Sequence, residues 1–284
     1  MKKLKTLKTF SILRKGNKTA TMDQQLSNKT EKQAKSVGAL AKKEAEKKTA
    51  NVTGEKKKLK TEDTGKKFEM AICMTYGIPY DGKFKYSLEE CEKLVPRLSK
   101  LPELFPMCAH AARGGARYDF TSLIDEIVTS LQHLSAKTSK KFGSRVAPQV
   151  IGQAQPTKFC EILGIPYTTI PALKEYIQVN ILSILPILVS YTFDCAIIYY
   201  IEKPSIIKFI RLIKEIEWDS YKYEWTLSWD RWNNGSNLKI IKDGKKHSLL
   251  EFQFHSASRT NMAVRWYFDK FLDIFKDHLS ITDL

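Results

Sequence analysis

Residues 116–159 read ARYDFTSLIDEIVTSLQHLSAKTSKKFGSRVAPQVIGQAQPTKF, and the rest of the chain is organised around them. This stretch contains two short β-like runs, Arg117 to Leu123 and Ser130 to Thr138. Asp119 lies on the first run and Lys137 on the second. If the runs pair as neighbouring antiparallel strands, both side chains project from the same end of one sheet.

A carboxylate and a lysine in that arrangement suit metal-assisted cleavage of a phosphodiester. The carboxylate holds a hard divalent cation, and the lysine orients water and steadies developing charge. The alternative is a surface aspartate and a solvated lysine on an ordinary hairpin. The segment that follows, Lys137 to Gln153, is dense in amides and cations, as a loop crossing a sugar-phosphate backbone should be.

Short motifs in a fixed order carry a family resemblance. They are Phe-Glu-Met-Ala-Ile at 68–72, Asp119, Ser-Ala-Lys-Thr at 135–138, Ala-Pro-Gln-Val-Ile-Gly-Gln at 147–153, Pro-Thr-Lys-Phe at 156–159, and Glu-Phe-Gln-Phe-His at 251–255 followed by Arg259 and Arg265. In this order they resemble type II restriction endonucleases of the PD-(D/E)xK superfamily, and among these the small enzymes that cut four-base palindromes. The resemblance spans most of residues 68–284.

The resemblance implies Mg²⁺-dependent, sequence-specific cleavage of double-stranded DNA at a short site. It makes Asp119 the first metal ligand and Lys137 the lysine that positions water, with Ser135 and Glu69 as supporting ligands. Ser135 departs from the family, whose members usually carry Glu, Asp, Gln or Asn two residues before the lysine. The alternative function is therefore a DNA-binding protein of nuclease descent with weakened or lost hydrolysis.

The resemblance also implies partners. The expected DNA contacts are Lys140, Lys141, Gln149, Gln153, Gln253, His255 and Arg259. For the residues near the C-terminal end, a Gln/Arg network that braces the site is the other reading. A cognate DNA methyltransferase is implied as well, and monomer and homodimer both stay open.

The positive charge is concentrated at the N-terminal end. Residues 1–67 carry 20 Lys/Arg and 7 Asp/Glu, which is +13 of the net +16, and one aromatic residue, Phe10. Such a segment buries too little apolar surface to offset its ordering entropy. The sequence therefore predicts a disordered Lys-rich tail at 1–67 and an endonuclease domain at 68–284, the tail being a linker, a DNA-binding arm or an import signal.

The five cysteines form no CxxC pair, so the sequence predicts free thiols and no zinc site. The first residues lack the apolar core of a secretory signal. From Lys174 to Ile201 the chain is strongly apolar, but Asn180, Pro186 and Asp194 interrupt it. A buried helix ending near Ser190, then a core strand from Ala196, is favoured over a membrane span. We expect an intracellular protein, in the cytoplasm or in the nucleus of a eukaryotic host, without a membrane partner.

The fold class expected is α/β, with a mixed, mostly antiparallel sheet of about five or six strands flanked by helices. Strands are also expected at Tyr221 to Trp229 and in a hairpin around Asp243-Gly244. Helices are expected from Phe68 to Tyr76, Ser87 to Ser99, Pro156 to Leu163, Ser205 to Ile216 and Asn261 to Phe275.

Overall fold

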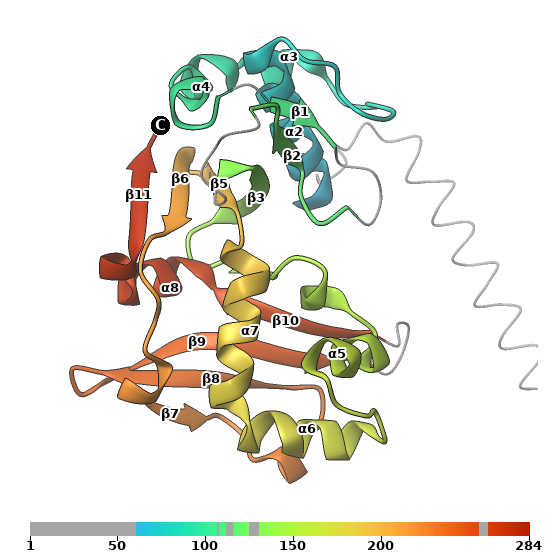
Figure 1. Cartoon of the computed structure of the whole chain (residues 1–284), viewed down its shortest axis with the longest axis vertical. Helices are drawn as coiled ribbons and strands as arrows, with labels where there is room; N and C mark the ends of the chain where they lie inside the picture. Colours follow the sequence, from blue (N-terminus) through green and yellow to red (C-terminus); the bar gives the residue numbers. More distant parts are fainter. Residues whose placement is uncertain (1–60, 107, 112–115, 125–130, 256–260) are drawn as a thin grey trace, which may run out of the picture. The chain divides into compact units, whose positions relative to one another are not determined.

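The computed structural model describes residues 61–106, 108–111, 116–124, 131–255 and 261–284. The chain divides at residue 58 into two units, and the second is Leu59–Leu284. The described residues belong to the second unit, which is mixed α/β with two sheets flanked by helices (Figure 1). The α/β fold class predicted from the sequence is therefore confirmed.

The first sheet has six strands and carries the two runs that opened the sequence analysis. In spatial order its strands are β1 (Cys108–His110), β2 (Phe120–Ser122), β3 (His133–Lys141), β5 (Ala196–Lys203), β6 (Ile206–Leu212) and β11 (Leu279–Asp283). β3 and β5 run parallel and the other neighbours run antiparallel. This is the mixed, mostly antiparallel sheet that the sequence predicts.

β5 is the central strand because its apolar residues are buried on both faces. Ala196 to Tyr200 alternate between two cores, with Ile197 and Tyr199 on one side and Ile198 and Tyr200 on the other. Parallel pairing with β3 requires a long crossover, and residues 142–195 supply it. A continuous apolar strand covered on both faces is typical of such a crossover unit.

A second sheet of five strands was not predicted. In spatial order its strands are β4 (Arg145–Val146), β10 (Met262–Tyr267), β9 (Lys245–Phe254), β8 (Gly235–Lys242) and β7 (Lys222–Trp225), all antiparallel. The hairpin expected around Asp243-Gly244 is the β8–β9 hairpin. Both turn residues have positive φ, 51° and 71°, which suits the tight turns of two-residue hairpins.

The helices pack around two cores. α2 (Thr61–Tyr76) covers one face of the six-stranded sheet through Phe68 and Ile72. α7 (Ile181–Phe193) and α8 (Phe268–Ile274) lie in the other core, which also holds the inner face of the five-stranded sheet (Figure 1). The remaining helices are α3 (Leu88–Glu92), α4 (Leu101–Leu104), α5 (Pro156–Leu163) and α6 (Ile170–Val179), with 3₁₀ turns at Val95–Leu98, Ile151–Gln153, Trp218–Ser220, Trp229–Arg231 and Lys276–His278.

Two predicted helices are wrong. The segment Ser205 to Ile216 contains strand β6, not an amphipathic helix. Its closely spaced Ile and Phe residues fit a helical period, but they are buried on both faces of a strand between β5 and β11. The segment Asn261 to Phe275 is strand β10 followed by α8, because Met262, Val264 and Trp266 alternate into the core.

The described part of the domain begins earlier than predicted. α2 starts at Thr61, and Thr64 and Lys67 are already buried on it. α2 therefore includes residues 61–67, which the sequence analysis placed in the tail. Residues 1–60 lie outside the described residues, so a disordered tail there stays a prediction.

The apolar segment before β5 folds as two helices, where a single buried helix ending near Ser190 was expected, and the core strand from Ala196 follows as predicted. In the described part of the chain no single helix is long and apolar enough to cross a membrane. α6 and α7 meet that requirement only as a pair, and they are bent by 94°. Most apolar residues of α7 are buried in the core. All five cysteines are buried and free, as predicted.

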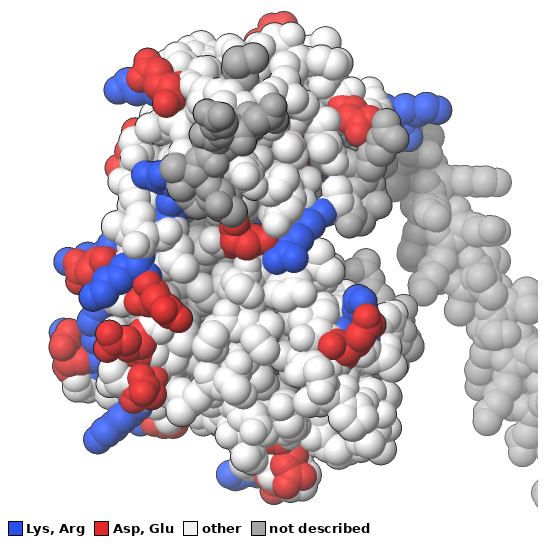
Figure 2. All heavy atoms as spheres, viewed as in Figure 1, with Lys and Arg blue, Asp and Glu red and all other residues white. Residues whose placement is uncertain are grey.

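Charges of both signs are interspersed on the surface. On the face shown in Figure 2, Lys and Arg lie beside Asp and Glu, and the area over α6 and α7 carries few charges. The residues from 68 onward carry 27 Lys/Arg and 24 Asp/Glu, so a balanced surface is what their composition predicts.

Candidate active site

Asp119 is held immediately before β2, at the end of the β2–β3 pair. Its backbone N–H donates to the Leu134 carbonyl (3.2 Å), and its own carbonyl accepts from the Ala111 N–H (3.0 Å). Its Oδ2 accepts hydrogen bonds from the backbone N–H of Ala136 (2.7 Å) and from the Ser135 hydroxyl (3.1 Å). The predicted antiparallel pairing of the two runs is confirmed, and it places Asp119 beside β3.

Lys137 and Ser135 lie on the same face of β3, because side chains alternate along a strand. Ser135 pairs with Ile197 and Lys137 with Tyr199, both on the α7 side of the sheet. Burial raises the pKa of Asp119, an effect that the nearby Lys137 charge opposes. Burial lowers the pKa of Lys137, and Asp119 opposes that shift in turn. The two groups are therefore electrostatic partners in a poorly solvated place.

A cluster of four further side chains fixes the run before β2. Asp194, at the end of α7, accepts from Arg117 Nη2 and from the Tyr118 hydroxyl, both at 2.7 Å. The Tyr118 ring stacks on His133 of β3 with centroids 3.9 Å apart and planes 3° from parallel. These contacts tie the two residues before Asp119 to the rest of the domain. Sequence reasoning missed this cluster, although a carboxylate inside an apolar segment was its signal.

Glu69 is buried, but on the other side of the sheet. It lies on α2, where its Oε2 is 3.0 Å from Lys66 Nζ, 3.5 Å from His110 Nε2 and 3.4 Å from the Tyr80 hydroxyl. Burial opposes ionisation of Glu69, but the hydrogen bonds from His110 and Lys66 outweigh it and lower the pKa. Its charge reaches Asp119 and raises the pKa of that carboxyl. Glu69 therefore influences Asp119 through its charge, while its own polar contacts are with Lys66, His110 and Tyr80.

The two glutamines of the 147–153 segment occupy different places. The Gln149 side-chain amide donates to Ser135 Oγ, and its backbone N–H donates to the Tyr191 carbonyl of α7 (2.8 Å). Gln153 ends the 3₁₀ turn Ile151–Gln153 and is exposed. Gln149 is therefore joined to Ser135 and through it to Asp119, whereas Gln153 faces solvent.

The other residues predicted to contact DNA are spread over both sheets. Lys140 and Lys141 end β3, and His255 follows β9 as an exposed residue. The Gln253 amide N–H donates to Glu251 Oε1 (3.0 Å), and its oxygen accepts from Arg265. Arg259 lies outside the described residues.

Gln253 is part of a polar network on the outer face of the five-stranded sheet. The centre of this network is the buried Glu251, whose Oε2 is 2.9 Å from Arg265 Nη2 and 3.2 Å from Arg145 Nε. Arg145 also bonds to the Tyr267 hydroxyl (3.2 Å), which donates to Asn237 Oδ1 (3.0 Å). The Gln/Arg network expected as one reading of this segment is present.

The side chains around Asp119 fit a hard divalent cation. The described residues contain no group of three or more His, Cys, Asp and Glu suited to a metal ion. What converges instead is one carboxylate, one hydroxyl and one amide, from Asp119, Ser135 and Gln149. Mg²⁺ accepts such oxygen donors, keeps several waters, and is often held by only one or two carboxylates.

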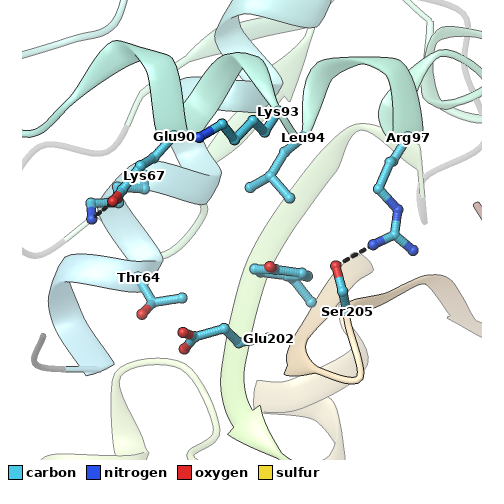
Figure 3. A pocket seen from close by; sticks show the side chains of 9 residues that line it. Thr64, Lys67, Glu90, Lys93, Leu94, Arg97, Glu202 and Ser205 are labelled. Carbon is cyan, nitrogen blue, oxygen red and sulfur yellow. Dashed lines mark hydrogen bonds and ion pairs between the residues drawn. The ribbon is translucent and has the colours of Figure 1, made fainter.

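A pocket of about 390 Å³ lies on the α2 side of the six-stranded sheet, opposite to the side that Ser135 and Lys137 face. Figure 3 shows the side chains that line it. Its cations are engaged: Lys67 pairs with Glu90, and Arg97 donates to Ser205 (Figure 3). Tyr200, which lines it, belongs to the α2 core, whereas Lys137 and Ser135 face the α7 core. This pocket is therefore separate from the Asp119 site.

A comparison with known proteins decides the family. The chain is 39% identical over 242 residues to a protein named type II restriction enzyme CviAII, from Paramecium bursaria Chlorella virus 1. The match covers 84% of this chain and 68% of the relative. This chain belongs to the type II restriction enzymes. No protein-family profile and no solved structure matches it.

Membership in the type II restriction enzymes confirms the family and enzyme class predicted from the sequence. The chain is a site-specific deoxyribonuclease, and PD-(D/E)xK nucleases are the usual class of such enzymes. The resemblance to enzymes that cut four-base palindromes stays a prediction.

Proposed function

We propose that this restriction enzyme cuts double-stranded DNA at a short specific sequence, with Mg²⁺ as cofactor, at the site formed by Asp119 and Lys137. The observation that carries the proposal is the arrangement of Asp119, Ser135 and Lys137 on one face of the β2–β3 pair. A carboxylate with a lysine as its electrostatic partner, both half-buried, is suited to phosphodiester hydrolysis.

Each side chain then has a role that its contacts support. Asp119 is held by Ala136 N–H and the Ser135 hydroxyl, so its carboxylate is fixed in direction before substrate arrives. Lys137 orients the attacking water and balances charge that develops on the phosphate. A bound Mg²⁺ neutralises phosphate charge and lowers the pKa of bound water. Glu69 contributes negative potential across the sheet.

DNA contacts are proposed on two surfaces. Lys140 and Lys141 follow the catalytic lysine on β3 and are suited to phosphate oxygens. Gln253 and His255 are proposed as contacts at the end of β9, and Arg259 as a further contact from outside the described residues; amide and guanidinium groups suit base edges in the major groove. Gln153 is exposed and joins this set. The basic residues 1–60 would add affinity that does not depend on sequence.

The partners inferred from the family complete the proposal. A DNA methyltransferase that modifies the same site would protect the host DNA. Monomer and homodimer both remain compatible with a palindromic target. An intracellular location, in the cytoplasm or in a eukaryotic nucleus, follows from the DNA substrate.

The second candidate is a DNA-binding protein with weakened hydrolysis, and the observation that favours it is Ser135. Its hydroxyl is neutral and is already bonded to Asp119, so it adds no negative charge for a cation. Such a protein would bind DNA without cutting it, or would cut it very slowly at any Mg²⁺ concentration.

One assay separates the two functions. Long unmethylated DNA is incubated with the intact chain, with Mg²⁺ in one arm and EDTA in the other. The proposal expects discrete fragments in Mg²⁺ and none in EDTA. Uncut DNA in both arms, together with DNA binding in a shift assay, would support the second candidate instead.

A further inference from the structure

We propose that Gln149 belongs to the metal site and that its side-chain amide oxygen binds the cation. This oxygen compensates for Ser135, which carries no carboxylate. The sequence places Gln149 among the DNA contacts, so this is a different role for it. The inference rests on the proposed function, because it concerns the cation held at Asp119.

The first argument is the chain of hydrogen bonds at the site. The Gln149 amide donates to Ser135 Oγ, and the Ser135 hydroxyl donates to Asp119 Oδ2 at 3.1 Å. Three oxygen-bearing side chains from three different segments therefore meet at one place. A base-reading glutamine would instead hold its amide toward the DNA, with both ends available for a base edge.

The second argument is the backbone that holds Gln149 there. Val150 has φ 57° and ψ −59°, and the Ile151 N–H donates to the Gln149 carbonyl across it at 2.5 Å. This is a tight γ-turn of the rare, strained kind, and a β-branched residue is a genuine outlier in it. Strained backbone persists only where the surroundings enforce it, and it clusters at functional sites.

The surroundings do enforce this turn. The Gln149 N–H is fixed to the Tyr191 carbonyl at 2.8 Å. Gly152 is buried, and a Cβ there would lie 2.6 Å from Ala147 Cβ, so the segment packs against itself too closely for a side chain. Val150 itself is 47% exposed, so its own packing does not explain the conformation. The turn therefore serves to place Gln149.

The chemistry of the amide suits the role. An amide presents either its N–H₂ or its oxygen, depending on a half-turn about its last bond. When the oxygen faces Ser135, the single hydroxyl proton of Ser135 can go to the amide, while Asp119 keeps its hydrogen bond from the Ala136 N–H. Mg²⁺ and Mn²⁺ bind amide oxygens as well as carboxylates. Asp119 and Gln149 would thus provide two protein oxygens, with water in the other positions.

The test is a Mn²⁺ titration of the intact chain in the presence of its own cleaved DNA fragments, followed by electron paramagnetic resonance of free Mn²⁺. Gln149→Ala should raise the Kd for Mn²⁺ by about tenfold or more. Gln149→Glu keeps an oxygen at the same reach and adds a negative charge, so its Kd for Mn²⁺ should equal that of wild type or be lower. The matched control Gln132→Ala, an exposed glutamine, should stay within about threefold of wild type. Affinity of Gln149→Ala for DNA in EDTA should equal that of wild type.

Two results would overturn the inference. One is an unchanged Mn²⁺ Kd in Gln149→Ala. The other is a loss of DNA affinity in EDTA with the Mn²⁺ Kd unaltered, which would return Gln149 to the DNA interface. Asp119→Ala in the same titration separates this failure from that of the proposed function, because the site itself is wrong if Asp119→Ala also binds Mn²⁺ normally. If Gln149→Ala unfolds, Gln149→Asn retains the amide one methylene short and should show the same loss.

Discussion

Among single residues, Asp119 is the proposed ligand that brings negative charge to the cation, because Ser135 and Gln149 are neutral. Ser135 donates to Asp119 and accepts from Gln149, so it connects the two proposed cation ligands. A carboxylate at position 135 would reach the same place with a formal charge. The identity of this residue should therefore set the Mg²⁺ concentration at which the enzyme works.

A Mg²⁺ titration of cleavage tests the contribution of residue 135. Ser135→Ala removes a hydrogen bond from Asp119 and should raise the Mg²⁺ concentration for half-maximal cleavage by about three- to tenfold. Gln149→Ala should also raise the half-maximal Mg²⁺ concentration, and adding Ser135→Glu to that variant should lower the concentration toward the wild-type value. A titration curve identical to wild type for Ser135→Ala would mean that the hydroxyl only fills space in the strand.

Glu69 gives a contrasting expectation in the same titration. It is bonded to Lys66, His110 and Tyr80 on the α2 side of the sheet, and only its field reaches Asp119. Glu69→Gln should therefore shift the half-maximal Mg²⁺ concentration less than Ser135→Ala does. A larger shift for Glu69→Gln would place Glu69 among the metal ligands, as the sequence resemblance implies.

Asp194 is proposed as a positioning residue for Asp119. It accepts from Arg117 and Tyr118, the two residues before Asp119. Asp194→Asn should lower kcat for cleavage by about tenfold or more, since a small misplacement of a catalytic group is costly, while DNA affinity in EDTA stays unchanged. Asp283→Ala, which removes the exposed ion pair with Lys208, is the matched control and should cut normally. Equal kcat for Asp194→Asn and wild type would remove Asp194 from the site.

At the scale of elements, the 147–153 segment is the most constrained part of the site. Gly152→Ala would push a Cβ against Ala147 and should lower the free energy of unfolding by about 1–3 kcal/mol. Gly65→Ala in α2 is the matched control: its Cβ would meet only Thr138 Oγ1 at 3.7 Å, and alanine is favoured in helices by roughly 0.5–1 kcal/mol. Urea unfolding of both variants measures the difference, and equal stabilities would mean that the segment relaxes freely.

The pairing of β2 with β3 was predictable because its signals are local. Two short β-like runs close together in the sequence were enough to bring Asp119 beside β3. The apolar segment before β5 was equally readable, because Asn180 and Pro186 break it and the residues of β5 are buried on both faces.

The failures lie where tertiary packing outweighs the local pattern. In β6 the apolar residues satisfy a helical period and a two-sided strand at once, and only the neighbours β5 and β11 decide between them. The second sheet escaped prediction because β4 has two residues and β10 was absorbed into the helix that follows it. The Asp194 cluster joins residues 76 or 77 positions apart, which no spacing rule detects.

In the whole molecule, most of the net charge lies far along the chain from the proposed catalytic site. Residues 1–60 carry 18 Lys/Arg and 5 Asp/Glu, which accounts for +13 of the net +16. Contacts with phosphates carry no sequence information, and their contribution falls steeply with salt. Affinity and specificity should therefore be separable by truncation.

Deleting residues 1–60 tests that separation. The truncated chain, which keeps all of α2, should bind DNA more weakly, with a flatter dependence of log Kd on log salt concentration. The fragments that it produces should be the same as those of the intact chain. A changed fragment pattern would mean that residues 1–60 read bases.

The most direct test of the central claim is the rate of DNA cleavage by Asp119→Ala and Lys137→Ala in saturating Mg²⁺. Both variants should fold like wild type, and each should cleave slower by about two orders of magnitude or more, the size expected for a lost catalytic group. Asp277→Ala and Lys276→Ala, exposed residues of the same two kinds, should cleave at the wild-type rate. Wild-type rates from Asp119→Ala or Lys137→Ala would contradict the placement of the active site on the β2–β3 pair.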